Sequence, residues 1–264
     1  MVRSLSLLWR RQRLSQANVS STIQRFGNTT NQVECQRWGQ LQRSLLNLSY
    51  GNGKVFLVPH ERVRGKMQGG MIALPMPPFP TGVMRGRFHP TEGQLYLCGM
   101  FAWAGSATQS VGLYRLRATG RPIHLLIGSQ ATKLGIKLTF TAPLDPKTVA
   151  AGKVRIKTWS LKRTAQYGSK HFDEKPLDVR SATLLLDRKT VPVDVPDIRL
   201  TWCMEIKYEF GSATGVPVSG VIHNTIHELA DQLRQPRTGL RRGLNRFEQT
   251  HAVSFAQLST LPTP

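Results

Sequence analysis

From Leu45 onward, apolar residues come in short runs of four to eight, which Gly, Pro, Asn or Asp interrupt. Runs of this length, rich in Val, Ile, Leu, Phe and Tyr, are typical of β-strands. Strict alternation over Gly135–Phe140 places Ile136, Leu138 and Phe140 on one buried face of a strand. The sequence therefore predicts an all-β protein. The predicted strands are Ser44–Tyr50, Lys54–Pro59, Met71–Leu74, Gly82–Phe88, Gln94–Met100, Gly112–Arg117, Gly135–Phe140, Val154–Trp159, Leu177–Leu186, Val191–Val195 and Thr201–Phe210.

Turn residues separate many of these strands. The segment Pro90-Thr91-Glu92-Gly93 predicts a hairpin, because proline presets φ at the first corner and glycine supplies the positive φ that lets the chain return. Gly69-Gly70 and Gly51-Asn52-Gly53 also have the composition of turns. Ala165–Lys175 is too long and too polar for a tight turn, so we expect an ordered loop there, which lies on the surface or on a neighbouring element.

Three aromatic residues are predicted to be buried in the second half of the chain. Trp202 begins an alternation through Met204, Ile206, Tyr208 and Phe210, whose partners on the other face are mostly charged. Trp159 and Phe140 occupy comparable positions in their own predicted strands. Strands at this spacing over about 100 residues suggest a β-sandwich.

The helix signal comes late in the chain. Asn224 or Thr225 could cap a short helix over Ile226–Gln235, which would have one apolar face. That face would consist of Ile226, Leu229, Ala230 and Leu233. The sequence thus predicts five parts. These are a disordered basic leader over 1–43, a β segment over 44–128, a β-sandwich over 129–222, a short helix over 223–235 and a disordered tail over 236–264.

The chain carries a formal net charge of +21 and has a sequence pI near 10.9. Such a charge attracts anionic partners. In the middle of the chain, however, no run of five or more like charges occurs, and no nucleic-acid-binding signature is found. Nucleic acid is therefore not the expected partner, and non-specific binding of anions or nucleic acid through this charge is kept as a second alternative. No window approaches the roughly 18 uninterrupted apolar residues of a membrane span, so no membrane partner is expected.

The termini and cysteines say little about location. The apolar patch near the N-terminus is cut short by Arg10, Arg11 and Arg13, so it does not resemble a working signal peptide. Cys35, Cys98 and Cys203 form no C-x-x-C pair, which excludes a cysteine-rich zinc site and a c-type haem attachment.

The candidate site residues are few, and no catalytic residue can be assigned. His223 and His227 have the four-residue spacing of a metal pair on a helix, but H-N-T-I-H lacks the glutamate of H-E-x-x-H, so a structural role is favoured over a metal site. Ser169, His171 and Glu174 share one loop, although catalytic triads are normally assembled from distant segments. Four further residues could line a polar groove or simply satisfy turns and sheet edges. They are His60, Glu61, Arg85 and Arg87.

Several long motifs resemble a known group of proteins. The stretches SLLNLSYGNGKVFLVPHE, QGGMIALPMPPFPTGVMRGRFHPTEGQLYLCGMFAWAG and GLYRLRATGRPIHLLIG are similar to the end of a β-propeller in large secreted bacterial proteins. Those proteins are described as haem-binding, large multifunctional, or quinoprotein glucose/sorbosone dehydrogenase-like. The segments LTFTAPLDPKTV, LTWCMEIKYEF and VIHNTIHEL resemble the Ig-like β domain that follows the propeller.

The resemblance implies that 44–128 forms the last one or two propeller blades and that 129–222 forms an Ig-like β-sandwich. It also implies a periplasmic or secreted location. About six strands are present in the blade segment, where a closed propeller needs roughly twenty-four. The chain is therefore expected to hold no cofactor, and a haem or quinone would belong to parts of such proteins outside this chain.

These observations predict a non-catalytic C-terminal fragment that serves as a structural or interaction module of a protein linked to carbohydrate oxidation or degradation. An open sheet edge would pair with upstream propeller blades or with a second copy of the chain. The alternative is a part of a sugar dehydrogenase-like or glycoside-directed enzyme whose catalytic site lies mostly in upstream domains.

Overall fold

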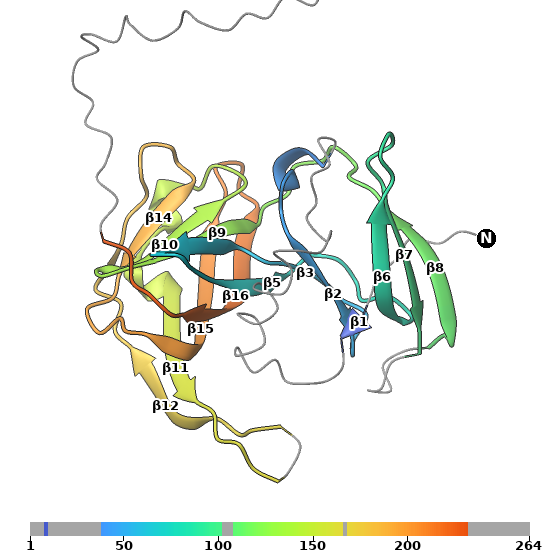
Figure 1. Ribbon diagram of the computed structural model, residues 1–264. Helices are drawn as coiled ribbons and strands as arrows, with labels where there is room; N and C mark the ends of the chain where they lie inside the picture. Colours follow the sequence, from blue (N-terminus) through green and yellow to red (C-terminus); the bar gives the residue numbers. More distant parts are fainter. Residues whose placement is uncertain (1–7, 10–37, 102–107, 166–167, 232–264) are drawn as a thin grey trace, which may run out of the picture. The chain divides into compact units, whose positions relative to one another are not determined.

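The regular elements of the computed structural model are strands and three short 3-10 helices (Figure 1). The structure describes residues 8–9, 38–101, 108–165 and 168–231. Its strands form three sheets of nine, four and three strands, and none of the sheets closes on itself. The all-β prediction is confirmed at this level. In the described residues, no helix is long and apolar enough to cross a membrane.

The nine-stranded sheet runs in the order β1-β2-β3-β5-β16-β15-β11-β12, with β4 paired to β5 beside this path. Its strands are β1 (Leu8–Trp9), β2 (Leu46–Tyr50), β3 (Val55–Leu57), β4 (His60–Val63), β5 (Lys66–Ala73), β11 (Val154–Ser160), β12 (Phe172–Leu177), β15 (Thr201–Gly211) and β16 (Pro217–Ile226).

The other two sheets are smaller, and the 3-10 helices lie outside the sheets. The four-stranded sheet runs in the order β13 (Ser181–Ala182), β14 (Thr190–Asp194), β10 (Gly135–Phe140) and β9 (Leu126–Thr132). The three-stranded sheet runs in the order β6 (Gly82–Phe88), β7 (Leu95–Met100) and β8 (Val111–Leu116). The 3-10 helices are η1 (Gly39–Leu41), η2 (Pro146–Thr148) and η3 (Ala151–Lys153).

The hairpin predicted around Pro90 joins β6 to β7. Phe88 pairs with Leu95 at its base, and Gly93 has φ +68°, the left-handed conformation that the turn requires. The carbonyl oxygen of Gly93 also accepts a hydrogen bond of 2.6 Å from Nε1 of Trp38. The hairpin prediction is therefore confirmed.

An aromatic cluster lies where β10 and β15 pack together. The ring of Phe140 meets Tyr208 at 5.2 Å and Phe210 at 5.7 Å between centroids, both edge to face. All three side chains are buried, as the alternation in the two strands predicts. Each buried aromatic side chain contributes on the order of 2–3 kcal/mol to folding, so this cluster is a main anchor of the core.

The prediction that Trp202 is buried is wrong, although Trp159 is buried as expected. Trp202 is 57% exposed, whereas Trp159 is 6% exposed. The register between β15 and β16 shifts between Thr201 and Met204. A bulge of this kind puts an extra residue into one strand and re-aims the side chains around it, so the alternation that holds from Met204 onward does not extend back to Trp202.

These two tryptophans should respond differently to truncation. We expect Trp159→Ala to lower the free energy of unfolding by about 3 kcal/mol, because it leaves a large cavity. Trp202→Ala should lower it by less than about 1 kcal/mol, because little apolar area leaves the interior. Urea unfolding followed by far-UV circular dichroism measures both changes, and equal losses for the two variants would contradict the bulge.

The predicted helix over 223–235 is not formed in the described residues. His223–Ile226 belong to β16, which pairs with β15 along its length and with β5 at Met71, Gly70 and Gly69. Residues 227–231 are not helical, and 232–235 lie outside the described residues. The strand forms because hydrogen bonds on both edges and β-branched residues favour the extended backbone over an isolated helical turn.

Two other predicted elements are also corrected. Polar residues over Phe172–Lys175 form part of β12 rather than a loop, because they pair with β11. In the predicted strand Leu177–Leu186, Leu177 is the last residue of β12, and of the rest only Ser181–Ala182 forms a strand.

The folded region begins before the predicted boundary at Ser44. Trp38 and Leu41 are buried in the main core, and Trp38 packs edge to face on Phe88 at 5.1 Å. The pairing of β5 with β16 also places strands from both sides of the predicted boundary at Gly128 in one sheet. The described residues all fall in one compact unit. The predicted tail over 236–264 and most of the predicted leader lie outside the described residues.

Candidate functional site

His223 and His227 lie on and just beyond β16, and they contact different groups. Nε2 of His223 lies 3.4 Å from Oε2 of Glu205, and its ring meets Trp159 edge to face at 6.3 Å. His227 instead lies against Trp202 at 5.0 Å. Four residues of extended chain span roughly 13 Å, so the strand separates two imidazoles that a helix would have brought together.

Burial lowers the pKa of His223, although the Glu205 carboxylate acts in the opposite direction. Among the described residues, no group of three or more His, Cys, Asp or Glu is placed to hold a metal ion. Each histidine packs on a tryptophan, His223 on Trp159 and His227 on Trp202.

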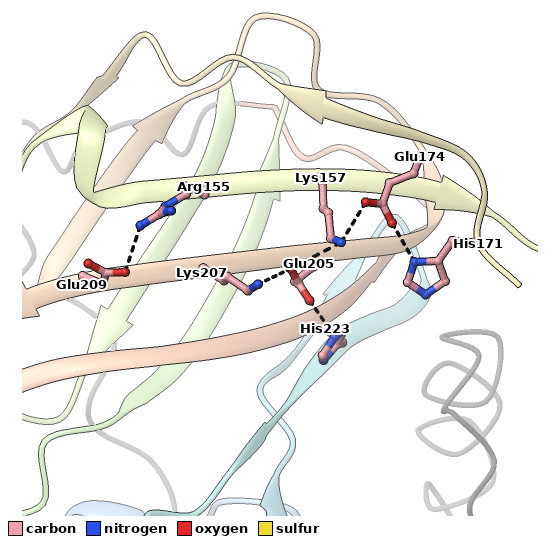
Figure 2. Close-up of polar contacts among 8 residues, drawn as sticks. All are labelled: Arg155, Lys157, His171, Glu174, Glu205, Lys207, Glu209 and His223. Carbon is pink, nitrogen blue, oxygen red and sulfur yellow. Dashed lines mark hydrogen bonds and ion pairs between the residues drawn. The ribbon is translucent and has the colours of Figure 1, made fainter.

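A charged network surrounds Glu205 on the face of β11, β12 and β15 (Figure 2). Nζ of Lys157 lies 2.9 Å from Oε1 of Glu174 and 3.9 Å from Oε1 of Glu205. Lys207 reaches the same Glu205 oxygen at 3.2 Å, and Nδ1 of His171 lies 2.7 Å from Oε2 of Glu174. The hydrogen bond with His171, followed by that with Lys157, lowers the pKa of Glu174. Each carboxylate thus already has at least two partners.

The network fastens β12 to the rest of its sheet. The ring of His171 stacks on Trp159 with centroids 4.1 Å apart and an angle of 18° between the planes. Trp159 is on β11, whose neighbours in the sheet are β12 and β15. A tryptophan on this otherwise charged face is buried because His171 and His223 both pack on it. The chemistry that this arrangement supports best is ion pairing and stacking at a sheet surface.

Glu61 and Gln68 form a second polar group, which links β4, β5 and β9. Oε1 of Glu61 accepts hydrogen bonds from Nε2 of Gln68 at 2.7 Å and from the backbone N–H of Ala131 at 2.8 Å. Gln68 also donates to the carbonyl oxygen of Glu228 at 2.9 Å. Its own Oε1 accepts from the N–H groups of His227 at 2.8 Å and Glu228 at 2.9 Å. The buried Gln68 amide therefore uses all of its donors and two acceptor positions.

Burial raises the pKa of Glu61, and the N–H of Ala131 and the Gln68 amide oppose this rise. For an acid with a raised folded-state pKa, the unfolded chain loses its proton first as the pH increases. The contribution of Glu61 to the free energy of unfolding is therefore most favourable below its unfolded-state pKa near 4.5. It decreases as the pH rises from there toward the folded-state pKa.

We therefore expect Glu61→Gln to gain stability relative to the wild-type chain between pH 4 and pH 7. The glutamine Oε1 can still accept both N–H groups, but the variant has no buried charge to form. Urea unfolding at the two pH values measures the difference. Glu61→Leu is the control, because it loses the acceptor and should be less stable than the wild type at both. A constant difference between Glu61→Gln and the wild type would contradict the raised pKa.

The four candidate residues for a polar groove are not brought together. His60 and Glu61 lie on β4 of the nine-stranded sheet, whereas Arg85 and Arg87 lie on β6 of the three-stranded sheet. His60 contacts the carbonyl oxygen of Val58 at 3.0 Å, and each arginine donates to the carbonyl oxygen of the residue before it. Within the described ranges, no hydrogen bond or ion pair joins either arginine to His60 or Glu61. Ser169, from the other loop considered, accepts from the N–H of Lys162.

The three-stranded sheet carries an exposed face that is partly apolar and partly basic. Register places its residues in three rows across the strands, and the buried residues Leu95, Leu97 and Tyr114 point to the other face. The rows are Met100 with Val111, then Arg85 with Cys98 and Leu113, then Arg87 with Tyr96 and Arg115.

The apolar part of this exposed face consists of several well-exposed side chains. Val111 is 70% exposed and Leu113 is 64% exposed, and Met84, Met100 and Phe101 nearby are also exposed. Contiguous apolar residues rimmed by charge mark interaction surfaces. This signal is present in the sequence, because both the odd and the even positions of Val111–Leu116 include apolar residues, and only one of the two sets can face the core.

The strand β8 lies at an edge of its sheet. In the part of the chain that the structure describes, its hydrogen-bonded neighbour is β7, and no backbone hydrogen bond outside the ladder involves residues 111–116. An edge with free N–H and C=O groups beside an apolar surface is the arrangement that pairs with another strand. Among the groups described above, the edge of β8 with its exposed face is therefore the candidate binding site.

No protein-family model, curated protein or solved structure matches this chain.

Proposed function

We propose that this chain is a non-catalytic interaction module whose three-stranded sheet accepts a strand from another polypeptide. The observation that carries the proposal is the open edge of β8, which lies beside the exposed Val111 and Leu113. Pairing would give hydrogen-bond partners to the edge, and the added side chains would cover the apolar residues.

The resemblance of the sequence to propeller proteins supports a β-propeller as the assembly that the chain joins. A three-stranded antiparallel sheet would be part of a propeller blade, and its edge would pair within a propeller of a secreted protein linked to carbohydrate oxidation or degradation. The Ig-like β domain would be the part built around β10, β14 and β15. In this proposal the chain contributes structure and contact surface, and any haem or quinone belongs to other parts of the assembly.

A peptide-display selection against the purified chain tests the proposal. We expect enriched peptides to alternate β-branched or aromatic residues, as added strands do. The edge-blocked variant, Val111→Lys with Leu113→Lys, should lose this enrichment, because lysines on an edge strand disfavour pairing. Both substituted side chains are exposed, so the variant should keep its fold, which circular dichroism checks.

Two results would contradict the proposal. One is enrichment that is equally strong on the edge-blocked variant, because the peptides would then bind elsewhere. The other is measurable oxidation or hydrolysis of sugars by the isolated chain, which would contradict its non-catalytic character.

A further inference from the structure

The exposed face of the three-stranded sheet determines what kind of strand can be added. In an antiparallel pair, residues directly opposite each other share a face and interact through their side chains. A strand added to β8 would therefore place one side chain beside Val111, one beside Leu113 and one beside Arg115. These three positions alternate along β8 and belong to the exposed face.

The first two positions call for apolar side chains. Val111 and Leu113 are among the most exposed large apolar residues of the described chain. Met100 lies opposite Val111 in the neighbouring strand, so the apolar surface continues onto β7. Apolar side chains opposite both residues would remove this surface from water, at about 25 cal/mol for each Å² buried.

The third position calls for an acidic side chain. Arg115 is exposed, and within the described residues it has no ion pair. The same row includes Tyr96 and Arg87, and Arg87 is also exposed and has no ion pair in the described part of the chain. A carboxylate opposite Arg115 would thus meet its guanidinium group directly, and Arg87, two strands further across the sheet, adds to the positive charge of the same row.

Charge also decides between a second copy of this chain and a different polypeptide. Residues 82–117 hold four arginines and a single acidic residue, Glu92. Glu92 is engaged by the hydroxyl group of Tyr96 at 3.2 Å. A second copy would bring the same excess of positive charge to the edge. Each copy of the whole chain carries a net charge of +21, so two copies repel each other. An acidic partner strand is attracted by the same charges.

Building on the proposed function, we propose that the partner of β8 is an extended polypeptide segment in which an acidic residue is followed, two and four residues later, by apolar β-branched residues. The acidic residue lies opposite Arg115, and the apolar residues lie opposite Leu113 and Val111. The added strand runs antiparallel to β8, as β7 does on the other side.

Three synthetic peptides test this inference by fluorescence anisotropy against the full chain. They share one alternating sequence of Thr and Val flanked by Gly and Ser, and they differ by carrying Asp, Ser or Lys two residues before the first Val. We expect the Asp peptide to bind at least tenfold more tightly than the Lys peptide, and added salt should reduce this ratio.

A charge swap identifies the position of the acidic residue. In Arg115→Glu, the preference should reverse, so that the Lys peptide binds more tightly than the Asp peptide. Arg62→Glu is the matched control, because Arg62 is an exposed arginine on β4 of another sheet, and it should change neither affinity more than twofold. Hydrogen exchange at residues 111–116 should slow when the Asp peptide is bound.

The outcomes separate the two proposals. Equal binding of all three peptides that is lost in the edge-blocked variant would leave the proposed function standing and would overturn the acidic partner. Failure of every peptide to bind would contradict the proposed function itself. A dimer in light scattering that dissociates in the edge-blocked variant, and that the Asp peptide does not displace, would make a second copy the occupant and would also overturn the inference.

Discussion

Replacement of Gln68 by leucine is expected to lower the free energy of unfolding by about 4 kcal/mol. The buried amide of Gln68 makes four hydrogen bonds. It accepts from the backbone N–H groups of residues 227 and 228, and it donates to the carbonyl oxygen of Glu228 and to Oε1 of Glu61. Leucine has a similar size but no polar atoms, so Glu61 loses one donor in a partly buried site. Each buried polar group that loses its partner costs about 1–3 kcal/mol, and these losses are not fully additive.

Urea unfolding at pH 7 measures the effect. Gln42→Leu is the matched control, because Gln42 is exposed, and it should change the stability by less than about 0.5 kcal/mol. Gln68→Glu should be at least as damaging as Gln68→Leu at pH 7, because it sets a second carboxylate against Glu61, and it should recover in part at pH 4. A loss below about 1 kcal/mol for Gln68→Leu would show that the amide is not the link between β5 and residues 227–228.

This polar group could be predicted only in part. From the sequence, Glu61 is a candidate for a polar groove with Arg85 and Arg87, or for a residue that satisfies a turn or a sheet edge. The actual partners are Gln68, seven residues on, and Ala131, seventy residues on. Such pairs depend on which strands become neighbours, and strand order cannot be read from alternation. In contrast, the exposed face of β8 is local, and the residues that form it could have been found by assigning alternate positions to opposite faces.

The fold was predictable where a single strand or hairpin contains all of the information. The alternation in Gly135–Phe140 and the hairpin at Pro90–Gly93 are both confirmed, because side-chain period and turn chemistry act within a few residues. The prediction is wrong where long-range pairing decides the outcome. The bulge that exposes Trp202 lies between β15 and β16, and the segment expected to start a helix at Ile226 is the end of β16.

Gly69 and Gly70 show the same limit. The pair has the composition of a turn, but both residues lie inside β5, between β4 and β16. Gly69 pairs with His60 on one side and Thr225 on the other. Glycine is needed here because neighbouring backbones approach closely, which is the second common reason for glycine in a strand.

Replacement of Gly69 by alanine is therefore expected to destabilise the chain by about 3 kcal/mol or more. A Cβ atom at Gly69 would lie 2.2 Å from the carbonyl oxygen of Pro59 and 2.8 Å from Cα of His60. Both are backbone atoms, so the overlap can be relieved only by moving β4 away from β5, which also disturbs the carboxylate of Glu61. Gly152→Ala is the matched control, because a Cβ there would have no atom within 4 Å, and its midpoint in urea should stay within the range of an ordinary surface substitution. The close approach in the sheet predicts that Gly69→Ala unfolds at a much lower urea concentration than Gly152→Ala and that hydrogen exchange along residues 60–73 becomes faster. If Gly69 were instead a turn residue, as its sequence suggests, the two variants would unfold at nearly the same urea concentration. Hydrogen exchange along residues 60–73 would then be unchanged.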